Sequence, residues 1–338
     1  MSVETVPVEA ARVLARSALV VSNVSEANAD STAAALIKAE IDGQGGHGLS
    51  RVPSYTVQSR AGKVDGHAVP ALVDVRPGLF RVDAGHGFAY PAFDLALPEL
   101  ARRAEAQGVA VCAIHRSHHF GVAGHHCEWL AERGLIAFVY GNAPKALAPW
   151  GATVPVLGTN PIAFAAPMDG APLVIDMAVT TVARGKILAA REIGEPIPDG
   201  WAFGPDGQPT TDAATALQGT MAPIGDAKGA ALALMVEVMS ACLAGAALGA
   251  EASSLFDAEG PPPDLGQTVL AVDATALSGG AFATRMAALA DIYAEIPGAR
   301  FPGARRLGAR AAAAADGLSV KSALVAKIEA IAKGEERS

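Results

Sequence analysis

Histidines are concentrated in one short segment of this chain. Five of the eight histidines lie between residues 115 and 126, and His118 and His119 come soon after an apolar run at residues 109–114. Such a run is typical of a buried strand, and active sites of α/β folds collect at the carboxyl ends of strands. Because histidine titrates near neutral pH, one placed there can act as a general acid or base. The sequence predicts acid–base chemistry at this point, with structural histidines as the alternative.

The same segment raises the question of a metal site. Zinc sites combine Cys, His and carboxylate ligands at defined spacing, as in HExxH. Only Cys127 and Glu128 accompany these histidines, and the chain contains no HExxH. We therefore predict no metal ion, and a metal-dependent hydrolase or lyase stays as a competing hypothesis.

A second polar group lies in a glycine-rich segment. Residues 42–55 contain Asp42, His47, Ser50, Arg51 and Tyr55. Glycine lets the backbone come close to a ligand, and arginine can hold a carboxylate through two parallel hydrogen bonds. The segment is a candidate carboxylate site, with an ordinary surface loop as the alternative.

This segment also contains the pattern GxGxxG, at residues 43–48. In a dinucleotide-binding βαβ unit the pattern follows a strand and begins a helix. Here the preceding residues have helical spacing, and Pro53 follows soon after. We therefore do not interpret the pattern as a phosphate loop.

Three further places carry groups that suit a ligand. Gly158-Thr159-Asn160-Pro161 predicts a fixed turn with exposed amide and hydroxyl groups that could hold a carboxylate. Asp176 ends an apolar run and so places a carboxylate at a strand end. Lys228 begins an apolar helix whose N-terminal dipole would help it meet a phosphate or a ribose.

Composition excludes several classes of protein. Hydrophobic residues make up 51% of the chain and charged residues 18%, which predicts a large core and argues against disorder. The net charge is −8 without runs of like charge, which argues against a nucleic-acid partner. The densest basic segment, residues 300–310, holds four arginines and is either a solvated loop and helix start or a phosphate contact.

Cellular location follows from weaker signals. Cys112, Cys127 and Cys242 lack paired spacing and are interpreted as buried thiols in a reducing compartment. The N-terminus, MSVETVPVEAARV, lacks the basic and apolar regions of a signal peptide. Residues 229–249 are apolar enough to suggest a membrane span, but Glu237 near their centre would cost about 2.5–3.5 kcal/mol on insertion. We predict a helix buried in the core of a cytoplasmic protein with no membrane partner.

The elements that position these residues alternate between helical and strand periodicity. Helices are predicted over residues 8–21, from the N-cap Ser25 to residue 41, and over 51–61, 90–106, 124–133, 228 onward and 319–333. Strands are predicted over residues 80–82, 109–114, 135–140, 162–165, 173–175 and 267–273. We expect an α/β or α+β fold in which residues 1–70 and 281–338 form one helical domain beside a central sheet domain of residues 71–280.

Six segments together resemble the malate/L-lactate dehydrogenase family of the non-Rossmann type, in the family's order and over nearly the whole chain. They are DGQGGHGLSRVPSY, SHHFGVAGHH, GTNPIAFAAP, VIDMAVTTVARGK, IPDGWAFGPDGQPTTD and PIGDAKGAALALMVE. That family includes L-sulfolactate and ureidoglycolate dehydrogenases and Δ1-piperideine-2-carboxylate/Δ1-pyrroline-2-carboxylate reductases. The resemblance implies an NAD(P)-dependent oxidoreductase and a homodimer. It also implies a sulfolactate-dehydrogenase-like fold: a central mixed-sheet cofactor domain plus a helical domain formed by both chain ends.

The resemblance also implies roles for individual residues. His119 matches the catalytic acid/base, His47 the substrate-side histidine, and Arg51 the arginine that binds the substrate carboxylate. Thr159 matches a substrate contact, and Tyr55 is a further candidate for one. The implied cofactor-binding positions are His119, Phe120, Gly121, Val122, Asn142, Asp176, Met177, Ala178, Lys228, Pro302, Gly303, Arg305 and Arg306.

Two positions depart from the family's pattern. Most members have Ser directly before the substrate-side histidine, where this chain has Gly46. The piperideine-carboxylate reductase has a relay Asp where this chain has Lys186, as many of the dehydrogenases do. A Ser-His-Asp relay is therefore not carried over, and His47 needs another partner to orient it or acts electrostatically.

The segments GKVDGHAVP, FRVDAGHGFAYPA and VAVCAIHRSHHF favour the cyclic-imine reductases. A protonated cyclic imine already carries its electrophilic charge, so hydride transfer to its C2 requires less of an acid than reduction of a ketone. We predict an NAD(P)H-dependent reductase of a small cyclic 2-imino acid, with a 2-hydroxy acid dehydrogenase as the alternative and a non-catalytic binding protein as a rival hypothesis. The arginines between residues 300 and 306 favour NADPH over NADH, because guanidinium groups suit a 2′-phosphate.

Overall fold

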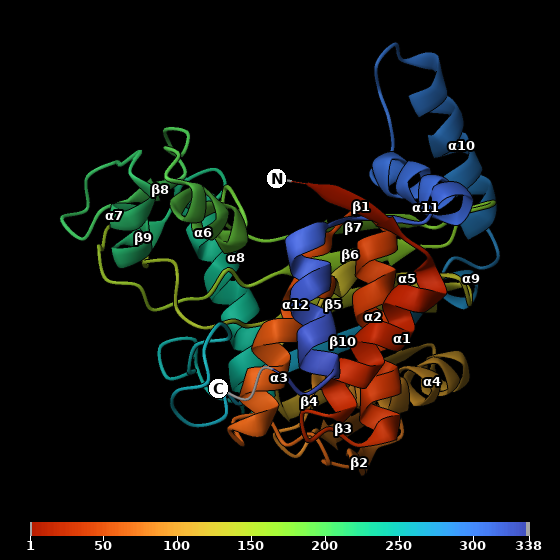
Figure 1. Ribbon diagram of the computed structural model, residues 1–338. Helices are drawn as coiled ribbons and strands as arrows, with labels where there is room; N and C mark the ends of the chain where they lie inside the picture. The colour runs from red at the N-terminus through yellow and green to blue at the C-terminus, as the bar shows by residue number, and fades with distance from the viewer. Residues whose placement is uncertain (1, 336–338) are drawn as a thin grey trace.

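The computed structural model describes residues 2–335, and a seven-stranded sheet forms its centre (Figure 1). In sheet order the strands are β2 (Ala71–Arg76), β3 (Leu79–Asp83), β4 (Val109–Ser117), β10 (Leu265–Asp273), β5 (Leu135–Gly141), β6 (Ile162–Ala166) and β7 (Leu173–Met177). Neighbouring strands are antiparallel, except that β3 and β4 are parallel. This mixed sheet confirms the predicted fold class and the six predicted strands. The edge strand β2 was not predicted, because most of its residues are exposed and give no apolar pattern.

Helices cover both faces of the sheet. Successive strand residues point to opposite faces, and β10 shows this directly. Val269 and Ala271 join the apolar cluster of α4 (Ala89–Gln107) and α5 (Ala123–Ala131). Thr268, directly before Val269, donates a hydrogen bond to the carbonyl of Met239, in the π-helical turn that continues α8 (Ala227–Glu237). The sheet therefore lies between α4 and α5 on one side and the end of α8 on the other.

An outer helical layer contains both ends of the chain (Figure 1). It is made of α1 (Val8–Val20), α2 (Glu26–Ile41), α3 (Val52–Arg60) and α12 (Ser322–Ala332). The Ser25 hydroxyl caps α2 by accepting a hydrogen bond from the Asn28 amide at 3.3 Å, which confirms the predicted N-cap. The last helix was predicted from residue 319 but begins at Ser322, because β11 (Leu318–Lys321) pairs with β1 (Val3–Val6). Neither short strand was predicted, since each is stabilised by a partner at the other end of the chain.

The two largest apolar clusters only partly follow the expected division of the chain. One joins the sheet to α4 and α5, and the other joins residues of both chain ends. After α9 (Ala274–Leu277), however, α10 (Phe282–Glu295) has no buried residue and projects from the body beside α11 (Ala304–Asp316) (Figure 1). The domain boundaries therefore stay a prediction, because α10 belongs to neither cluster.

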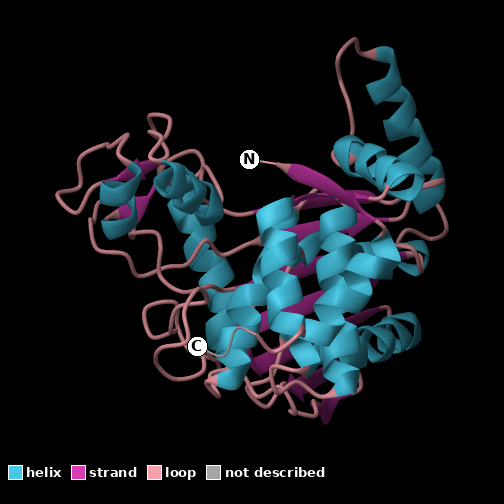
Figure 2. Cartoon of the chain, viewed as in Figure 1, coloured by secondary structure: helices cyan, strands magenta, loops and turns pink. Residues whose placement is uncertain are grey.

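A small lobe that the sequence pattern did not indicate lies at the other side of the molecule. It contains α6 (Arg184–Ile193), β8 (Ala202–Phe203), α7 (Ala213–Gln218) and β9 (Thr220–Met221). Figure 2 shows that long loops connect these short elements. The lobe has an apolar cluster of its own, which includes Ile187 and Met221.

Two expectations about burial were wrong. The apolar helix α8 is buried only in part, whereas Leu234 is 55% exposed and Val238, directly after the helix, is 49% exposed. Cys242, just after them, is also exposed, while Cys112 and Cys127 are buried as expected. Within residues 2–335, none of the helices combines the length and apolarity needed to cross a bilayer.

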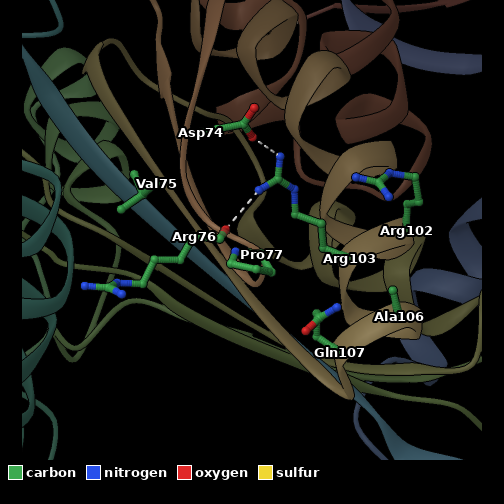
Figure 3. A pocket seen from close by; sticks show the side chains of 8 residues that line it. All are labelled: Asp74, Val75, Arg76, Pro77, Arg102, Arg103, Ala106 and Gln107. Atoms are coloured by element: carbon green, nitrogen blue, oxygen red, sulfur yellow. Dashed lines mark hydrogen bonds and ion pairs between the residues drawn. The ribbon is translucent and has the colours of Figure 1, made fainter.

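The edge of the sheet is fixed to α4 around a small hollow, which Figure 3 shows from close by. Arg103 donates hydrogen bonds to the carboxylate of Asp74, to the carbonyl of Arg76 and to Glu99 on its own helix. Its guanidinium also lies 4.6 Å from the centre of the Phe80 ring. These contacts stabilise the exposed strand β2, and the guanidinium of Arg103 is fully engaged within the protein.

Candidate active site

His119 lies just beyond the carboxyl end of β4, and both of its ring nitrogens meet other side chains. Its Nδ1 is 2.5 Å from the hydroxyl of Tyr55, and its Nε2 is 3.1 Å from Nδ1 of His47. The rings of His47 and His119 are nearly parallel, with centroids 5.2 Å apart. The structure thus brings together two histidines that are 72 residues apart in the chain.

The position of His47 depends on the glycine-rich segment. That segment forms two 3-10 turns, Gly45–His47 and Leu49–Arg51, between α2 and α3. A Cβ at Gly48 would lie only 2.1 Å from a carboxylate oxygen of Glu40, which accepts a hydrogen bond from the Leu49 amide. A side chain at this position would therefore displace the Glu40 carboxylate and its hydrogen bond to the loop. The GxGxxG pattern follows a helix, which confirms that it is not a Rossmann phosphate loop.

Tyr55 connects His119 to the interior. It is fully buried, and its hydroxyl also lies 3.1 Å from the hydroxyl of Tyr90 on α4. Burial raises the pKa of Tyr55 to about 12, so the phenol stays protonated at neutral pH. In this structure Tyr55 is a hydrogen-bond partner of His119. The direct substrate contact expected of Tyr55 stays a prediction, since its side chain is buried.

Both site histidines are neutral at neutral pH. Burial, together with repulsion by Arg51, lowers the pKa of His47 to about 4. Burial and the same arginine hold the pKa of His119 well below its usual value. The expectation of an imidazole with a pKa near the working pH was therefore wrong for the free protein, because the site is too poorly solvated to favour an imidazolium.

The nitrogen best placed to meet a substrate belongs to His47. Both nitrogens of His119 are engaged within the protein, and its side chain is 9% exposed. His47 is only partly buried, and its Nε2 has no hydrogen-bond partner among residues 2–335. A proton exchanged with a bound molecule therefore has a direct route through His47.

Arg51 is oriented beside this pair. Its Nε donates a hydrogen bond to the carbonyl of Gly46 at 2.8 Å, which leaves both terminal nitrogens for a ligand. The ring of Phe256 lies over the guanidinium, with its centroid 5.0 Å from the central carbon. The terminal nitrogens can then hold a carboxylate in the plane of the guanidinium.

The GTNP turn differs from expectation. Asn160 is completely buried, and its amide donates to the carbonyl of Ala233 and to the carboxylate of Glu237. The expected exposed amide group is therefore absent at Asn160, which joins the turn to α8 instead. Thr159 is partly exposed and accepts a hydrogen bond from the Val179 amide through its carbonyl. Its hydroxyl remains a candidate substrate contact.

Several expected cofactor residues gather where α5 begins. His119, Phe120, Gly121 and Val122 lead into this helix, whose first turn has no side-chain cap. Asp176, at the end of β7, accepts a hydrogen bond from the Gly124 amide at 2.9 Å. Burial raises the pKa of Asp176 to about 6, although part of the carboxylate remains open to solvent. Met177 and Ala178 follow on the same strand end, and Met177 is exposed.

Other expected cofactor residues are already engaged or lie apart. Asn142 is buried and uses its side chain to join the Ala247 carbonyl and the Gly266 amide. Lys228 is exposed in the first turn of α8, with no hydrogen bond or ion pair to the described part of the chain. Within residues 2–335, no hydrogen bond joins the side chain of either residue to the group at the start of α5.

Arg305 and Arg306, in the last expected cofactor-binding segment, differ in exposure and in ion pairing. Pro302 and Gly303 precede α11, and Arg305 is exposed without an ion pair to residues 2–335. Arg306 instead pairs with the buried carboxylate of Glu128 at 3.2 Å. Arg310, one turn further on, binds both Glu128 and Asp42. Arg305 is therefore the side chain of this loop that is available to a ligand.

The side chains of His118, His125 and His126 have different surroundings. His125 lies 2.8 Å from Asp42, and His126 stacks on Phe93 and meets the carbonyl of Phe120. His118 packs edge-on against Tyr55, and neither of its nitrogens has a partner in the described structure. Among residues 2–335, no three histidine, cysteine or acidic side chains are placed to hold a metal ion.

The sequence pattern did not indicate two residues of the site. Tyr90 begins a helix in which nothing distinguishes it from a core residue, and Phe256 lies in an irregular segment without periodicity. Both are recognisable only through contacts to residues far away in the chain, Tyr55 and Arg51.

Comparisons with known proteins agree with the family resemblance of the sequence. The family described as malate/L-lactate dehydrogenase matches residues 6–329. A (2R)-3-sulfolactate dehydrogenase (NADP(+)) of Chromohalobacter salexigens is 50% identical, over 80% of this chain and 81% of the relative. A Δ1-pyrroline-2-carboxylate reductase of Ancylobacter novellus is 39% identical, over 94% of this chain and 95% of the relative. The crystal structure of a Δ1-piperideine-2-carboxylate reductase from Pseudomonas syringae pv. tomato superposes with a TM-score of 0.91 at 35% identity, covering 97% and 99% of the two chains.

Buried neutral histidines predict a pH-dependent stability. A histidine whose pKa falls below about 6.5 on folding binds fewer protons in the folded than in the unfolded chain. Stability should therefore fall as the pH drops from 6.5 towards 4, the interval set by His47, although the raised pKa values of Asp176, Glu40 and Asp94 contribute in the opposite direction. Burial lowers the pKa of His118 to about 3. We expect His118→Phe, which keeps a ring in place, to lose less melting temperature between pH 7 and 4.5 than the native protein.

The control for this measurement is His67→Phe, since His67 is exposed. Thermal unfolding followed by circular dichroism at both pH values gives the two differences. Equal losses in the native protein and in His118→Phe would contradict the neutral burial of His118.

Proposed function

This chain belongs to the malate/L-lactate dehydrogenase family of NAD(P)-dependent oxidoreductases, and we propose that it transfers a hydride from NAD(P)H to C2 of a small cyclic 2-imino acid. The substrate type is that of Δ1-pyrroline-2-carboxylate or Δ1-piperideine-2-carboxylate. The reductase relatives support this choice because they match the chain over nearly its full length.

The single observation that carries the proposal is the neutrality of both site histidines. A ketone must gain a proton as it accepts the hydride, and a neutral imidazole is a poor acid for that step. A cyclic imine that arrives protonated already has the proton it needs. The lowered pKa values of His47 and His119 thus suit an iminium substrate better than a carbonyl substrate in the reductive direction.

We assign the reacting groups as one connected unit. The terminal nitrogens of Arg51 bind the substrate carboxylate, and Nε2 of His47 meets the substrate nitrogen. His119 orients His47 through their 3.1 Å contact, and Tyr55 holds the other side of the His119 ring. The pair can take up at most one additional proton, since two imidazolium groups cannot coexist beside Arg51 at this distance.

The residues at the start of α5 suit a dinucleotide. The first turn of this helix has no N-cap side chain, and although its Gly124 N–H is donated to Asp176, the positive end of the helix dipole still favours a phosphate. A Cβ at Gly124 would lie 3.0 Å from atoms of Val174 and Asp176, so the glycine allows the helix end to lie directly against β7. When bound, the nicotinamide supplies the hydride. The task of Phe120, Gly121 and Asp176 is to position the cofactor.

A second candidate is oxidation of a 2-hydroxy acid of the sulfolactate type. The 50% identity to a sulfolactate dehydrogenase favours it. A neutral imidazole is also a competent base, so the same His47 could accept the hydroxyl proton as the hydride leaves C2.

The deciding experiment is NADPH and NADH turnover with a panel of substrates. We expect Δ1-pyrroline-2-carboxylate or Δ1-piperideine-2-carboxylate to give the highest kcat/KM, above pyruvate, oxaloacetate and sulfopyruvate, with (2R)-3-sulfolactate tested in the oxidative direction. A kcat/KM for sulfolactate or sulfopyruvate above that for both imines would replace the proposal by the second candidate.

The roles assigned to His47 and His119 predict that a change to Asn lowers kcat more at His47 than at His119. His47→Asn and His119→Ala should each lower kcat by about 10²-fold, the cost of misplacing a reacting group, because the iminium N–H loses the imidazole that positions it. His119→Asn should be milder, because an amide can still hydrogen-bond to Nδ1 of His47. Single-turnover rates at saturating NADPH measure these effects, with His67→Asn as the control. If His119→Asn lost as much as His47→Asn, the substrate would exchange its proton with His119 itself.

We propose NADPH as the preferred cofactor, with Arg305 as the residue that selects it. A charge-assisted hydrogen bond to the 2′-phosphate contributes about 1.5–3 kcal/mol, so Arg305→Ala should lower the NADPH-to-NADH ratio of kcat/KM by about 10- to 100-fold. Arg306→Ala should instead lower stability, because Glu128 loses a buried partner. Arg285→Ala on α10 is the control. A native ratio below one, or equal losses with both cofactors, would contradict the assignment.

We also propose a homodimer. Exposed apolar side chains lie on α10, where Ile292 is 54% exposed, and on α8, where Leu234 is 55% exposed. Exposed apolar faces of this kind are typical of protein interfaces. Sedimentation equilibrium measures the state directly, and a monomer at micromolar concentration would contradict the proposal.

We place the protein in the cytoplasm. Its three cysteines are unpaired in the structure, which is the expected state in a reducing compartment. Cell fractionation with an antibody tests this, and recovery outside the cytoplasm would overturn it.

A further inference from the structure

The side chain of Phe256 lies at the edge of the candidate site without a role in the chemistry described so far. Its ring covers one face of the Arg51 guanidinium, 5.0 Å from the central carbon, and is 45% exposed. Leu255 next to it is buried. An aromatic ring held half in the open beside a ligand-binding arginine is available to contact whatever that arginine binds.

The segment around Phe256 is irregular, yet four hydrogen bonds fix it to one place. Lys63 has a completely buried side chain, and its ammonium donates to the Asp257 carbonyl, the Asp257 carboxylate and the Glu259 carbonyl. An ammonium has three N–H groups, so each of them has an acceptor. The buried Gln58 adds a fourth hydrogen bond, to the carbonyl of Asp257. These contacts join residues that are 194 to 199 positions apart.

One helix therefore positions both the ring and the arginine. Arg51 directly precedes α3, Gln58 lies within it, and Lys63 comes three residues after its last residue, Arg60. Because all three belong to one short stretch, the position of Phe256 relative to Arg51 is fixed by local structure. A buried ammonium without its acceptors would be costly, which also keeps the segment in place.

We propose that Phe256 is a specificity-determining residue, positioned by Lys63, that favours substrates with an apolar hydrocarbon portion over substrates with a second acidic group. The proposal rests on the proposed function in one respect, namely that Arg51 binds the substrate carboxylate. A guanidinium binds a carboxylate in its own plane, so a ring on its face does not compete for the carboxylate. The ring lines the space beside it, which the remainder of the substrate occupies.

The chemistry of the ring discriminates between the two candidate substrates. The methylene groups of a pyrroline or piperideine ring gain from contact with an aromatic face, because both surfaces leave water. A sulfonate or second carboxylate in the same place would lose part of its hydration without a hydrogen-bond donor in return. Phe256 thus favours the cyclic imine over sulfopyruvate or oxaloacetate.

The test compares Phe256→Ala with Phe256→Leu in the full-length enzyme. We expect Phe256→Ala to raise the KM for Δ1-pyrroline-2-carboxylate by about 10- to 100-fold, the range in which apolar pockets discriminate. Its kcat and its dissociation constant for NADPH should change less than threefold, about the ordinary scatter of such effects. Phe256→Leu should retain most of the native KM. Leu277→Ala, at a residue that is 81% exposed on α9, controls for loss of an apolar side chain.

The role of Lys63 is tested by its coupling to Phe256. Lys63→Met keeps the apolar stem and removes three hydrogen bonds, and it should shift KM in the same direction with the ring still present. If Lys63 acts through the ring, the double variant should resemble Phe256→Ala alone, whereas independent effects on KM would multiply. Multiplying effects would overturn the positioning role. Gln58→Met removes only one of the four hydrogen bonds, and it replaces Lys63→Met in this comparison if that variant does not fold.

Failure of this inference and failure of the proposed function give different results. A native enzyme that reduces the imine, with an unchanged KM in Phe256→Ala, overturns the inference alone. A native enzyme that accepts only sulfopyruvate overturns the proposed substrate. In that case the inference still requires the KM for sulfopyruvate to fall in Phe256→Ala, and an unchanged value overturns it as well.

Discussion

Two buried carboxylates hold the site in its present form. Asp42 ends α2, immediately before the loop of His47, and Glu128 lies on α5, whose first turn faces the expected cofactor. Arg310 reaches both from α11 with hydrogen bonds of 2.6 to 2.9 Å. Burial alone would raise the pKa of Asp42, but hydrogen bonds from His125 and Arg310 lower it to about 2. Because an unpaired buried charge is costly, α2, α5 and α11 must come together as a unit, and the C-terminal part of the chain thereby fixes the substrate loop.

The electrostatic consequence is a site with one permanent charge. Arg51 is cationic at every relevant pH, and its repulsion adds to burial in keeping His47 and His119 neutral. An arriving carboxylate therefore meets a single positive group, and its binding offsets the repulsion that keeps the imidazoles unprotonated. Substrate binding and proton affinity are coupled at this place, since the anion that neutralises Arg51 makes protonation of the adjacent His47 easier.

Local pattern and resemblance were sufficient to predict six of the seven strands of the sheet and to single out His119, His47 and Arg51, which the structure brings close together. They failed where a structure depends on contacts between distant segments. The pairing of β1 with β11 and the hydrogen bonds of Lys63 to Asp257 leave no periodic signal in the sequence. Arg306 shows the same limit: its neighbours suggested a phosphate contact, whereas its partner Glu128 is far away in the chain. Burial also lowered the pKa of His47 and of the five histidines between residues 115 and 126, a direction that the residue type alone cannot indicate.

Nothing in residues 2–335 of the structure excludes a serine before His47, since a Cβ at Gly46 would have no atom within 4 Å. The carbonyl of Gly46 accepts a hydrogen bond from Nε of Arg51, so this position contributes to the arginine through its backbone. Lys186, at the place of the relay aspartate, is exposed on α6 in the small lobe. The hydrogen-bond partner that His47 does have is His119, at 3.1 Å, and His119 is itself held by Tyr55. Since a neutral imidazole both donates and accepts, His119 can orient His47 in either tautomer, which a serine and aspartate relay would do only in one.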